Sequence, residues 1–387
     1  MAGFSVAIVG CTGAVGAEMI ATLHRRQFPV STLHLFASAR SAGKTCNTPY
    51  GDLIITLFSV EAARACDVVF LAVSGTFAKE HAKAIAAQPN GALVIDNSSA
   101  FRYDDDIPLV VPEINCETAQ GQYLIANPNC TTAIAAVVLW PIHQTYGLEK
   151  VMISTYQASS GAGAAGMAEL KEGTACVLKG EDSPANTFAH PLAFNVIPHI
   201  DSFQDNGYTR EELKVVWETR KIFNLPELAL SCTCVRVPTL RAHAESLIIE
   251  TRDEVTPEGT VSLPFFSNAR CTVCCVVCCI CVLTKWCFFH PSLMIATRIL
   301  LSNSAGVLVK DDTSTNTYPM PLTASGCDDV EVGRIRQSLI FGKKGLELFV
   351  CGDQLLKGAA LNAVQIAEEM YSKGWLTPSV VDVEGKK

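Results

Sequence analysis

Charged residues are scarce in this chain of 387 residues, and positive charge is scarcer than negative charge. Charged residues make up 18% of the sequence and hydrophobic residues 49%, a balance that excludes an intrinsically disordered protein. Thirty basic against 38 acidic residues give a net charge of −8, which argues against a general nucleic-acid-binding protein. The length excludes a small stapled fold and predicts two or three domains. We expect small molecules and copies of the chain as partners.

The sequence also lacks the features of a targeting segment. No basic region precedes the first apolar run, so we expect neither a signal peptide nor a transit peptide and a cytoplasmic location. Cysteines stay reduced in that compartment. Seven of the 17 cysteines fall within residues 271–287, and we expect the other ten to be mostly small buried hydrophobes.

A glycine-rich turn follows the first apolar run. Residues 4–9 predict a strand, and an amphipathic stretch that ends near Arg26 predicts a helix. Glycines between a strand and a helix let a pyrophosphate approach the backbone at the helix N-terminus, and this order of elements makes the motif more specific than glycines alone. The candidate cofactor-binding residues in the turn are Gly10, Thr12, Gly13, Ala14, Val15 and Gly16.

The second predicted strand, residues 33–36, is not followed by the acidic residue that binds the ribose of NAD. Arg40 follows instead, between Ser38 and Ser41. An arginine with neighbouring hydroxyl groups suits a 2′-phosphate, so the sequence favours NADP, although a solvated basic loop is the alternative.

The alternation of strands and helices continues through the next hundred residues. Residues 67–73 and 92–95 predict buried strands, and residues 79–87 predict a helix. Repeated units of this kind predict a parallel, doubly wound sheet.

Cys130 lies where an Asn-Pro loop meets an apolar helical run at residues 133–140, with threonines able to cap the helix. A helix N-terminus stabilises a thiolate and lowers the cysteine pKa, so this position predicts a nucleophile whose backbone N–H faces a developing oxyanion. A structural cysteine is the alternative.

A catalytic cysteine needs a proton carrier, and His243 is the candidate among the eight histidines. Arg236, Arg241 and Glu245 surround it in the sequence. We interpret this group as an anion site with a proton carrier, the alternative being an ordinary core or surface histidine.

Three motifs in combination resemble aspartate-β-semialdehyde dehydrogenase. They are Asn-Pro-Asn-Cys-Thr-Thr at 127–132, Arg-Val-Pro from 236 with a histidine seven residues after the arginine, and Lys-Gly-Ala-Ala-Leu-Asn at 357–362. The resemblance covers residues 1–259 and 298–376, and the segments 98–102, 154–163 and 198–201 also resemble family sequences.

The resemblance implies an α/β fold with two domains. The first is an N-terminal Rossmann-type NADP-binding domain of residues 1–129, completed by the C-terminal helix region 355–387. The second is a mixed α/β catalytic and dimerisation domain of residues 130–354. A homodimer or a dimer of dimers is implied, with no nucleic acid, membrane or metal as a partner.

The resemblance also implies a role for each site residue. Cys130 would be the acylated nucleophile, His243 the general acid/base, and Gln157 would orient the acyl group. Arg236 would bind the substrate α-carboxylate through its planar fork and Glu211 the substrate ammonium. The residues implied at the phosphate are Arg102, Asn129 and Lys214, and those implied at the cofactor are Ser160, Gly161 and Asn362. Without the resemblance, Glu211 and Lys214 would be interpreted as a surface i,i+3 pair.

The implied reaction is reversible. Aspartyl 4-phosphate acylates Cys130, phosphate leaves, and hydride from NADPH reduces the thioester to aspartate 4-semialdehyde, in the biosynthesis of lysine, threonine and methionine. A related reductase acting on N-acetylglutamyl phosphate is an alternative, although Glu211 with Arg236 suits a free amine better. An inactive scaffold with a membrane or metal role is another.

One segment departs from the family pattern. About 37 residues, 261–297, are extra, and no acidic residue occurs between Gly259 and Lys310. The run is marginal in length for a membrane helix and contains Lys285. Its cysteines lack the turn residues of a zinc site. We favour translated non-coding sequence, because Val261-Ser262 could be encoded by a GTGAGT splice donor.

Overall fold

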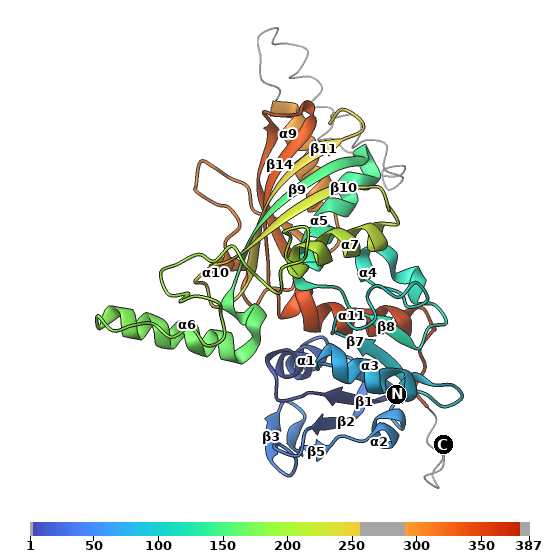
Figure 1. Cartoon of the computed structure of the whole chain (residues 1–387). Helices are drawn as coiled ribbons and strands as arrows, with labels where there is room; N and C mark the ends of the chain where they lie inside the picture. Colours follow the sequence, from blue (N-terminus) through green and yellow to red (C-terminus); the bar gives the residue numbers. More distant parts are fainter. Residues whose placement is uncertain (1–2, 256–290, 380–387) are drawn as a thin grey trace.

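A computed structural model describes residues 3–255 and 291–379. The predicted insertion therefore lies mostly outside the described residues. Two six-stranded sheets, packed with helices, make up most of the described chain, and Figure 1 shows them one above the other.

The first sheet is parallel throughout, in the order β5-β2-β1-β6-β7-β8. Its strands are β1 (Phe4–Val9), β2 (Val30–Ala37), β5 (Thr56–Leu57), β6 (Val68–Leu71), β7 (Leu93–Asp96) and β8 (Leu124–Ala126). Counted along the chain, this spatial order is 3-2-1-4-5-6, the order of a dinucleotide-binding Rossmann sheet. The predicted doubly wound α/β architecture is confirmed.

Helices cover both faces of this sheet because its strands are apolar on both sides. One face packs against α1 (Ala14–Arg25) and α11 (Leu361–Ser372), and the other against α3 (Gly75–Ala86). The C-terminal helix α11 thus completes the core of the N-terminal sheet, although some 235 residues of sequence separate it from β8 (361 against 126). Smaller elements are α2 (Val60–Arg64), α4 (Pro112–Asn115), the 3-10 helix η1 (Cys116–Ala119), and the hairpin of β3 (Thr45–Thr48) and β4 (Gly51–Ile54).

The second sheet is mixed, in the order β10-β9-β11-β14-β13-β12. Its strands are β9 (Leu148–Gln157), β10 (Ala229–Arg236), β11 (His243–Thr251), β12 (Val307–Val309), β13 (Val330–Ser338) and β14 (Gly342–Gly352). Helices α5 (Cys130–Tyr146), α7 (Arg210–Phe223) and α9 (Pro291–Ser302) share one apolar core with it. The remaining helical segments are η2 (Ser159–Ala162), α6 (Gly163–Leu178), α10 (Pro321–Ala324) and the π-helical η5 (Leu356–Ala360).

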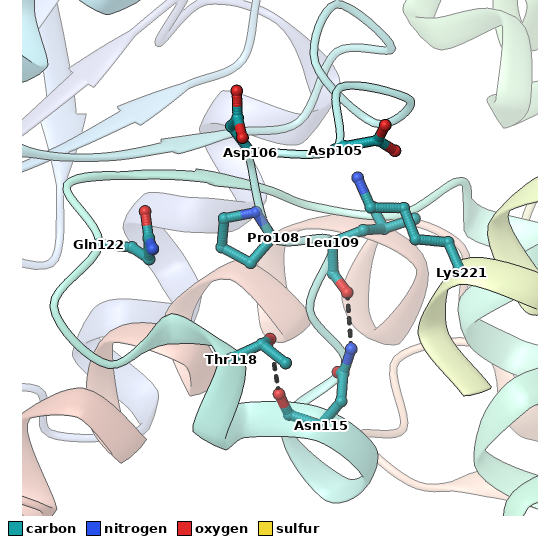
Figure 2. A pocket seen from close by; sticks show the side chains of 8 residues that line it. All are labelled: Asp105, Asp106, Pro108, Leu109, Asn115, Thr118, Gln122 and Lys221. Atoms are coloured by element: carbon teal, nitrogen blue, oxygen red, sulfur yellow. Dashed lines mark hydrogen bonds between the residues drawn. The ribbon is translucent and has the colours of Figure 1, made fainter. Parts of the chain in front are cut away.

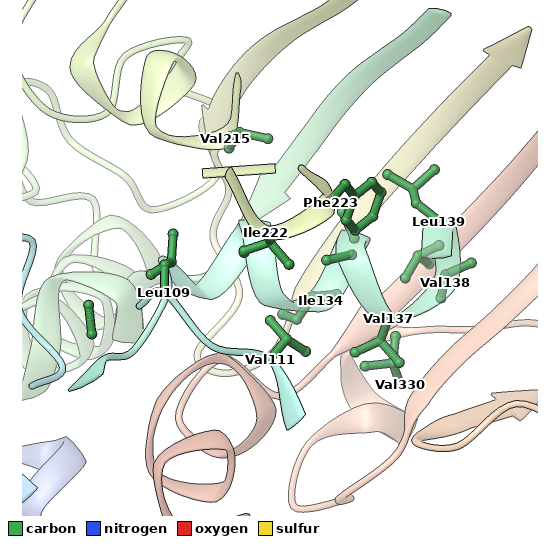
Figure 3. Packing of buried hydrophobic residues seen from close by; sticks show 14 of the residues in the cluster. Leu109, Val111, Ile134, Val137, Val138, Leu139, Val215, Ile222, Phe223 and Val330 are labelled. Atoms are coloured by element: carbon green, nitrogen blue, oxygen red, sulfur yellow. The ribbon is translucent and has the colours of Figure 1, made fainter. Parts of the chain in front are cut away.

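Helix α5 is apolar on nearly every side, which is typical of a buried helix. Figure 3 shows Ile134 and Val137 of this helix near Val111, with Ile222 and Phe223 of α7 on another side. The N-terminus of α5, which carries Cys130, is therefore held between α7 and the end of the first sheet.

Two expectations about helix α5 need correction. Helix α5 begins at Cys130 rather than at residue 133, and its cap is Asn129 rather than a threonine. The expected end of the insertion, residue 297, falls inside α9, where Ala296 and Thr297 are buried. Within residues 3–255 and 291–379, no helix is long and apolar enough to cross a membrane.

Candidate active site

Cys130 is the first residue of α5. The Asn129 side chain accepts hydrogen bonds from the backbone N–H groups of Thr131 (3.0 Å) and Thr132 (3.3 Å), an N-cap that fixes the entry into the helix. Gly358 of η5 packs against the cysteine, because a Cβ at position 358 would lie 2.6 Å from Cys130 Cβ. The predicted nucleophile thus lies between the first turn of α5 and the backbone of η5.

The predicted lowering of the Cys130 pKa is wrong for the free chain. Desolvation by the surrounding protein, followed by the charge of the nearby Glu211 carboxylate, raises the pKa of the thiol to about 12. Arg102, Arg236 and the Thr131 N–H act in the opposite direction but do not compensate. The helix N-terminus is therefore a weaker influence than burial at this site.

Glu211 of α7 gathers three of the predicted site residues. One carboxylate oxygen accepts from Asn129 Nδ2 (2.9 Å) and Gln157 Nε2 (3.2 Å), and the other from Lys214 Nζ (3.0 Å). Lys214 Nζ also donates to Asp201 (2.7 Å). Burial opposes ionisation, but Lys214 and these hydrogen bonds lower the pKa of Glu211 below its ordinary value. The alternative of an ordinary surface pair is wrong, because Glu211 is buried among polar partners.

The Ala158 backbone holds both His243 and Arg236. Its N–H donates to His243 Nδ1 (3.0 Å), and its carbonyl accepts from Arg236 Nη1 (2.6 Å). A Cβ at Gly161 would lie 2.6 Å from Arg236 Nη1 and 3.4 Å from His243 Nε2, so only glycine fits beside both side chains. Burial, followed by the charge of Arg236, lowers the pKa of His243 to about 3.

The sequence grouping around His243 is only partly a spatial group. Arg241 belongs elsewhere: its guanidinium donates to Glu18 of α1 (2.6 Å) and to Asp353 (2.5 Å). Glu245 is fully buried, and neither carboxylate oxygen has a hydrogen-bond partner among the described residues. Of the charged residues in this sequence group, Arg236 alone accompanies His243 at the Ala158 backbone, so the interpretation of the whole group as an anion site is corrected.

Arg102 reaches the site from the loop after β7. Its guanidinium donates to Glu218 of α7 (3.0 Å) and to the Asn97 carbonyl (2.8 Å). The other oxygen of Glu218 accepts from the backbone N–H of Asn129 (2.6 Å). Glu218 was missed in the sequence analysis, although it follows Glu211 and Lys214 at i+7 and i+4 and so lies on their face of the helix.

Asn127 was also missed as a site residue. Its side chain donates to Asn97 (2.9 Å) and to the Ala359 carbonyl (3.1 Å), and accepts from Asn362 Nδ2 (2.7 Å). Asn362, expected near the nicotinamide, is thus tied to the loop that carries Cys130. The signal was present in the sequence, since Asn127 opens the Asn-Pro-Asn-Cys motif.

The glycine turn fits a dinucleotide. Gly10 has a φ of +86°, and a Cβ at Gly16 would lie 2.4 Å from the Gly10 carbonyl, so both positions require glycine. Thr12 and Gly13 are exposed at the start of α1, with Ala14 and Val15 partly exposed. After β2, Ser38 and Arg40 are exposed and Ser41 is partly exposed. Ser160 lies beside Gly161 and accepts from Gln354.

Family models divide the chain in the same way as the two sheets. Residues 5–122 match the model described as "Semialdehyde dehydrogenase, NAD binding domain", and residues 139–357 match "Semialdehyde dehydrogenase, dimerisation domain". This chain belongs to the aspartate-semialdehyde dehydrogenase family.

Individual relatives agree over nearly the whole length. The aspartate-semialdehyde dehydrogenase of Synechocystis is 42% identical over 372 residues, which cover 96% of this chain and 98% of that protein. That of Aquifex aeolicus is 40% identical over 377 residues, covering 96% and 99%. The structure of aspartate semialdehyde dehydrogenase II from Vibrio cholerae, complexed with ASA, matches with a TM-score of 0.82 at 37% identity, covering 96% and 99%.

A separate pocket lies away from these residues. Figure 2 shows it between the loop that carries Asp105 and Asp106, the segment around Asn115, and Lys221 of α7. None of the predicted catalytic, substrate or cofactor residues lines it.

Within the described part of the chain, no group of three or more histidine, cysteine or acidic residues could hold a metal ion. The cysteine cluster at 271–287 lies outside that part.

Proposed function

We propose that this chain interconverts aspartyl 4-phosphate and aspartate 4-semialdehyde through a thioester on Cys130, with NADP as its cofactor. The observation that carries the proposal is the arrangement of charge at the nucleophile. Glu211, Arg102 and Arg236 all lie near enough to Cys130 to shift its pKa. A carboxylate and two guanidinium groups around one thiol suit a substrate that bears an ammonium, a carboxylate and a phosphate.

The proposed substrate contacts follow from these charges. Arg236 binds the α-carboxylate. Among the described residues, its guanidinium makes one hydrogen bond, from Nη1 to the Ala158 carbonyl, so its other N–H donors remain available for the substrate. Ionised Glu211 binds the ammonium. This pairing favours a free amino acid over an N-acetylated one, and hence aspartyl over N-acetylglutamyl phosphate. The phosphate lies toward Arg102, Asn129 and Lys214.

His243 is the proposed general acid/base, and in the free chain its neutral ring is a hydrogen-bond donor. Its Nδ1 accepts from Ala158, so the neutral ring carries its proton on Nε2, a buried atom with no partner among the described residues. When Cys130 attacks the acyl carbon, the C–S bond forms, the oxyanion accepts from His243 Nε2–H, and phosphate leaves with the bonding pair of the C–O bond and takes up the thiol proton. When bound, the nicotinamide supplies or accepts the hydride that links thioester and aldehyde. Gln157, held beside Glu211, orients the acyl group.

Selectivity for NADP is assigned to Arg40, Ser38 and Ser41. Arg40 is exposed on the loop after β2, where the ribose of a bound dinucleotide lies in Rossmann sheets. A structurally similar aspartate semialdehyde dehydrogenase from Candida albicans, with a TM-score of 0.64 and 23% identity, was solved with NADP. The proposed pathway role is the supply of aspartate 4-semialdehyde for lysine, threonine and methionine, and the proposed assembly is a homodimer or a dimer of dimers.

An assay of NADP reduction tests the function. In the presence of phosphate, aspartate 4-semialdehyde should reduce NADP, and N-acetylglutamate semialdehyde should be a poor substitute for it. Cys130→Ser should retain less than about a thousandth of the activity while still binding NADP, because the serine hydroxyl is a weak nucleophile. Reduction of NADP by Cys130→Ser at the parent rate, or no dependence on phosphate, would contradict the proposal.

A further inference from the structure

Glu218 is a fully buried carboxylate that is absent from the proposed substrate contacts. Oε1 accepts from Arg102 Nη1 (3.0 Å) and from the Tyr103 hydroxyl (3.4 Å), and Oε2 accepts from the Asn129 backbone N–H (2.6 Å). One side chain thus joins the arginine loop after β7 to the residue that caps the nucleophile helix. These partners lie 116, 115 and 89 residues away in the sequence.

The contacts of Arg102 leave one donor in a defined place. Nη1 is held by Glu218 and Nη2 by the Asn97 carbonyl (2.8 Å), so two bonds fix the plane of the guanidinium. Nε is buried and has no partner among the described residues. A guanidinium fixed at two nitrogens presents the third in a set direction, which is what recognition of an anion requires.

We propose that Glu218 is a positioning residue that sets the phosphate-binding guanidinium of Arg102 and the Asn129–Cys130 turn in one mutual geometry. The inference deepens the proposed function and rests on it. Phosphate held by Arg102 is then placed relative to the acyl carbon at Cys130 by a single carboxylate, since one Glu218 oxygen binds Arg102 and the other binds the Asn129 N–H. The spacing of Glu211, Lys214 and Glu218 puts all three on one face of α7, so a single helix aligns the ammonium site, the phosphate site and the nucleophile turn.

Glu218→Gln tests the proposal with little change in volume. Every partner of Glu218 is a donor, so the glutamine NH2 must face either Arg102 or the Asn129 N–H and one of those bonds is lost. We expect the KM for phosphate to rise about tenfold and kcat to fall by a similar factor, while the Kd for NADP stays within about twofold.

A second readout needs no turnover. Iodoacetamide alkylation of Cys130, followed by mass spectrometry of the Cys130 peptide, reports phosphate binding as protection. The phosphate concentration that halves the alkylation rate should rise about tenfold in Glu218→Gln. If phosphate fails to protect Cys130 in the parent chain, the proposed function itself is contradicted. If phosphate protects the parent and Glu218→Gln equally, the role of Glu218 is overturned and the proposed function stands.

Glu212→Gln is the matched control. Glu212 is buried on the same helix, but it bonds the backbone N–H groups of Thr209 (2.7 Å) and Cys234 (3.0 Å) and not Arg102 or Asn129. It should lower stability without changing the phosphate KM, and an equal rise in both variants would overturn the proposal. If Glu218→Gln does not fold, Glu218→Asp keeps the charge but is one methylene too short to reach both partners. A folded Glu218→Asp with the parent phosphate KM would also overturn it.

Discussion

The Nδ1 atom of His243 accepts a hydrogen bond of 3.0 Å from the backbone N–H of Ala158, which decides where the imidazole carries its proton. A nitrogen that accepts a hydrogen bond is deprotonated, so the neutral ring is the Nε2–H tautomer. Because the pKa of His243 is lowered to about 3, the ring is neutral over the physiological range. His243 therefore begins each cycle as a hydrogen-bond donor at Nε2.

Substitution of His243 by asparagine or glutamine distinguishes the roles of the two ring nitrogens. His243→Asn keeps an acceptor near Nδ1 but has no group at Nε2, whereas His243→Gln extends an N–H donor toward the Nε2 position. We expect kcat to fall about 100-fold or more in His243→Asn. The loss of kcat in His243→Gln should be about tenfold smaller than in His243→Asn. Steady-state kinetics with matched thermal melts provide the measurement. Equal losses in the two variants would show that the Nε2 donor is not the catalytic feature.

The thiol of Cys130 should alkylate slowly at neutral pH in the free chain. Burial and Glu211 raise its pKa to about 12, so the thiolate fraction increases with pH above neutrality and reaches no plateau up to pH 10. The rate of carbamidomethylation of the Cys130 peptide, measured from pH 6 to 10, checks this. A midpoint below pH 7 would instead support the thiolate that the helix N-terminus alone predicts.

Arg40 should distinguish the two dinucleotides. Arg40→Ala is expected to weaken NADP binding by about tenfold or more, because a charge-assisted hydrogen bond to the 2′-phosphate is lost, and to leave NAD binding nearly unchanged. Fluorescence titration with both cofactors measures the two dissociation constants, and NAD serves as the internal control. A similar loss for both would mean that Arg40 does not contact the 2′-phosphate.

Glu245 should make the fold less stable at high pH. Burial raises its pKa well above the ordinary value, so the folded chain retains a proton that the unfolded chain releases above about pH 4.5. The free energy of unfolding then falls as pH rises from the unfolded pKa toward the folded one, by up to about 1.4 kcal/mol per pH unit.

Glu245→Gln removes this dependence, because an amide stays neutral at every pH. Urea melts at pH 5, 7 and 9 should show the variant gaining stability over the parent as pH rises. Glu149→Gln, at an exposed position on β9, is the control and should follow the parent. Parallel pH dependence in the parent and Glu245→Gln would refute the assignment of a protonated buried carboxyl.

Two deletions test the prediction that residues 261–297 are foreign to the fold. A variant lacking residues 261–290 keeps α9 and should be more soluble than the full chain and at least as active, because the deleted run is apolar and cysteine-rich. A variant lacking 261–297 also loses Ala296 and Thr297, which are buried, and should melt at a lower temperature. Lower activity in the shorter deletion, or the absence of a transcript without these codons, would count against the non-coding interpretation.

Local sequence was sufficient for several of the strands and helices. Apolar runs bounded by glycine or turn residues predicted β1, β6 and β7, because hydrophobic period and turn residues act over a few neighbouring positions. The Asn-Pro-Asn-Cys motif placed Cys130 at a helix N-terminus for the same reason.

Tertiary structure alone decided what those residues experience. The pKa of Cys130 depends more on burial and on Glu211, which lies 81 positions away (211 − 130), than on the helix that contains it. Arg241 and Glu245 are sequence neighbours of His243, but they do not lie with it at the Ala158 backbone. Glu218, in contrast, accepts a hydrogen bond from Arg102, which lies 116 positions away in the sequence. Desolvation and charge act through space, and a linear sequence records separation along the chain but not which distant groups the packed core brings within a few ångströms.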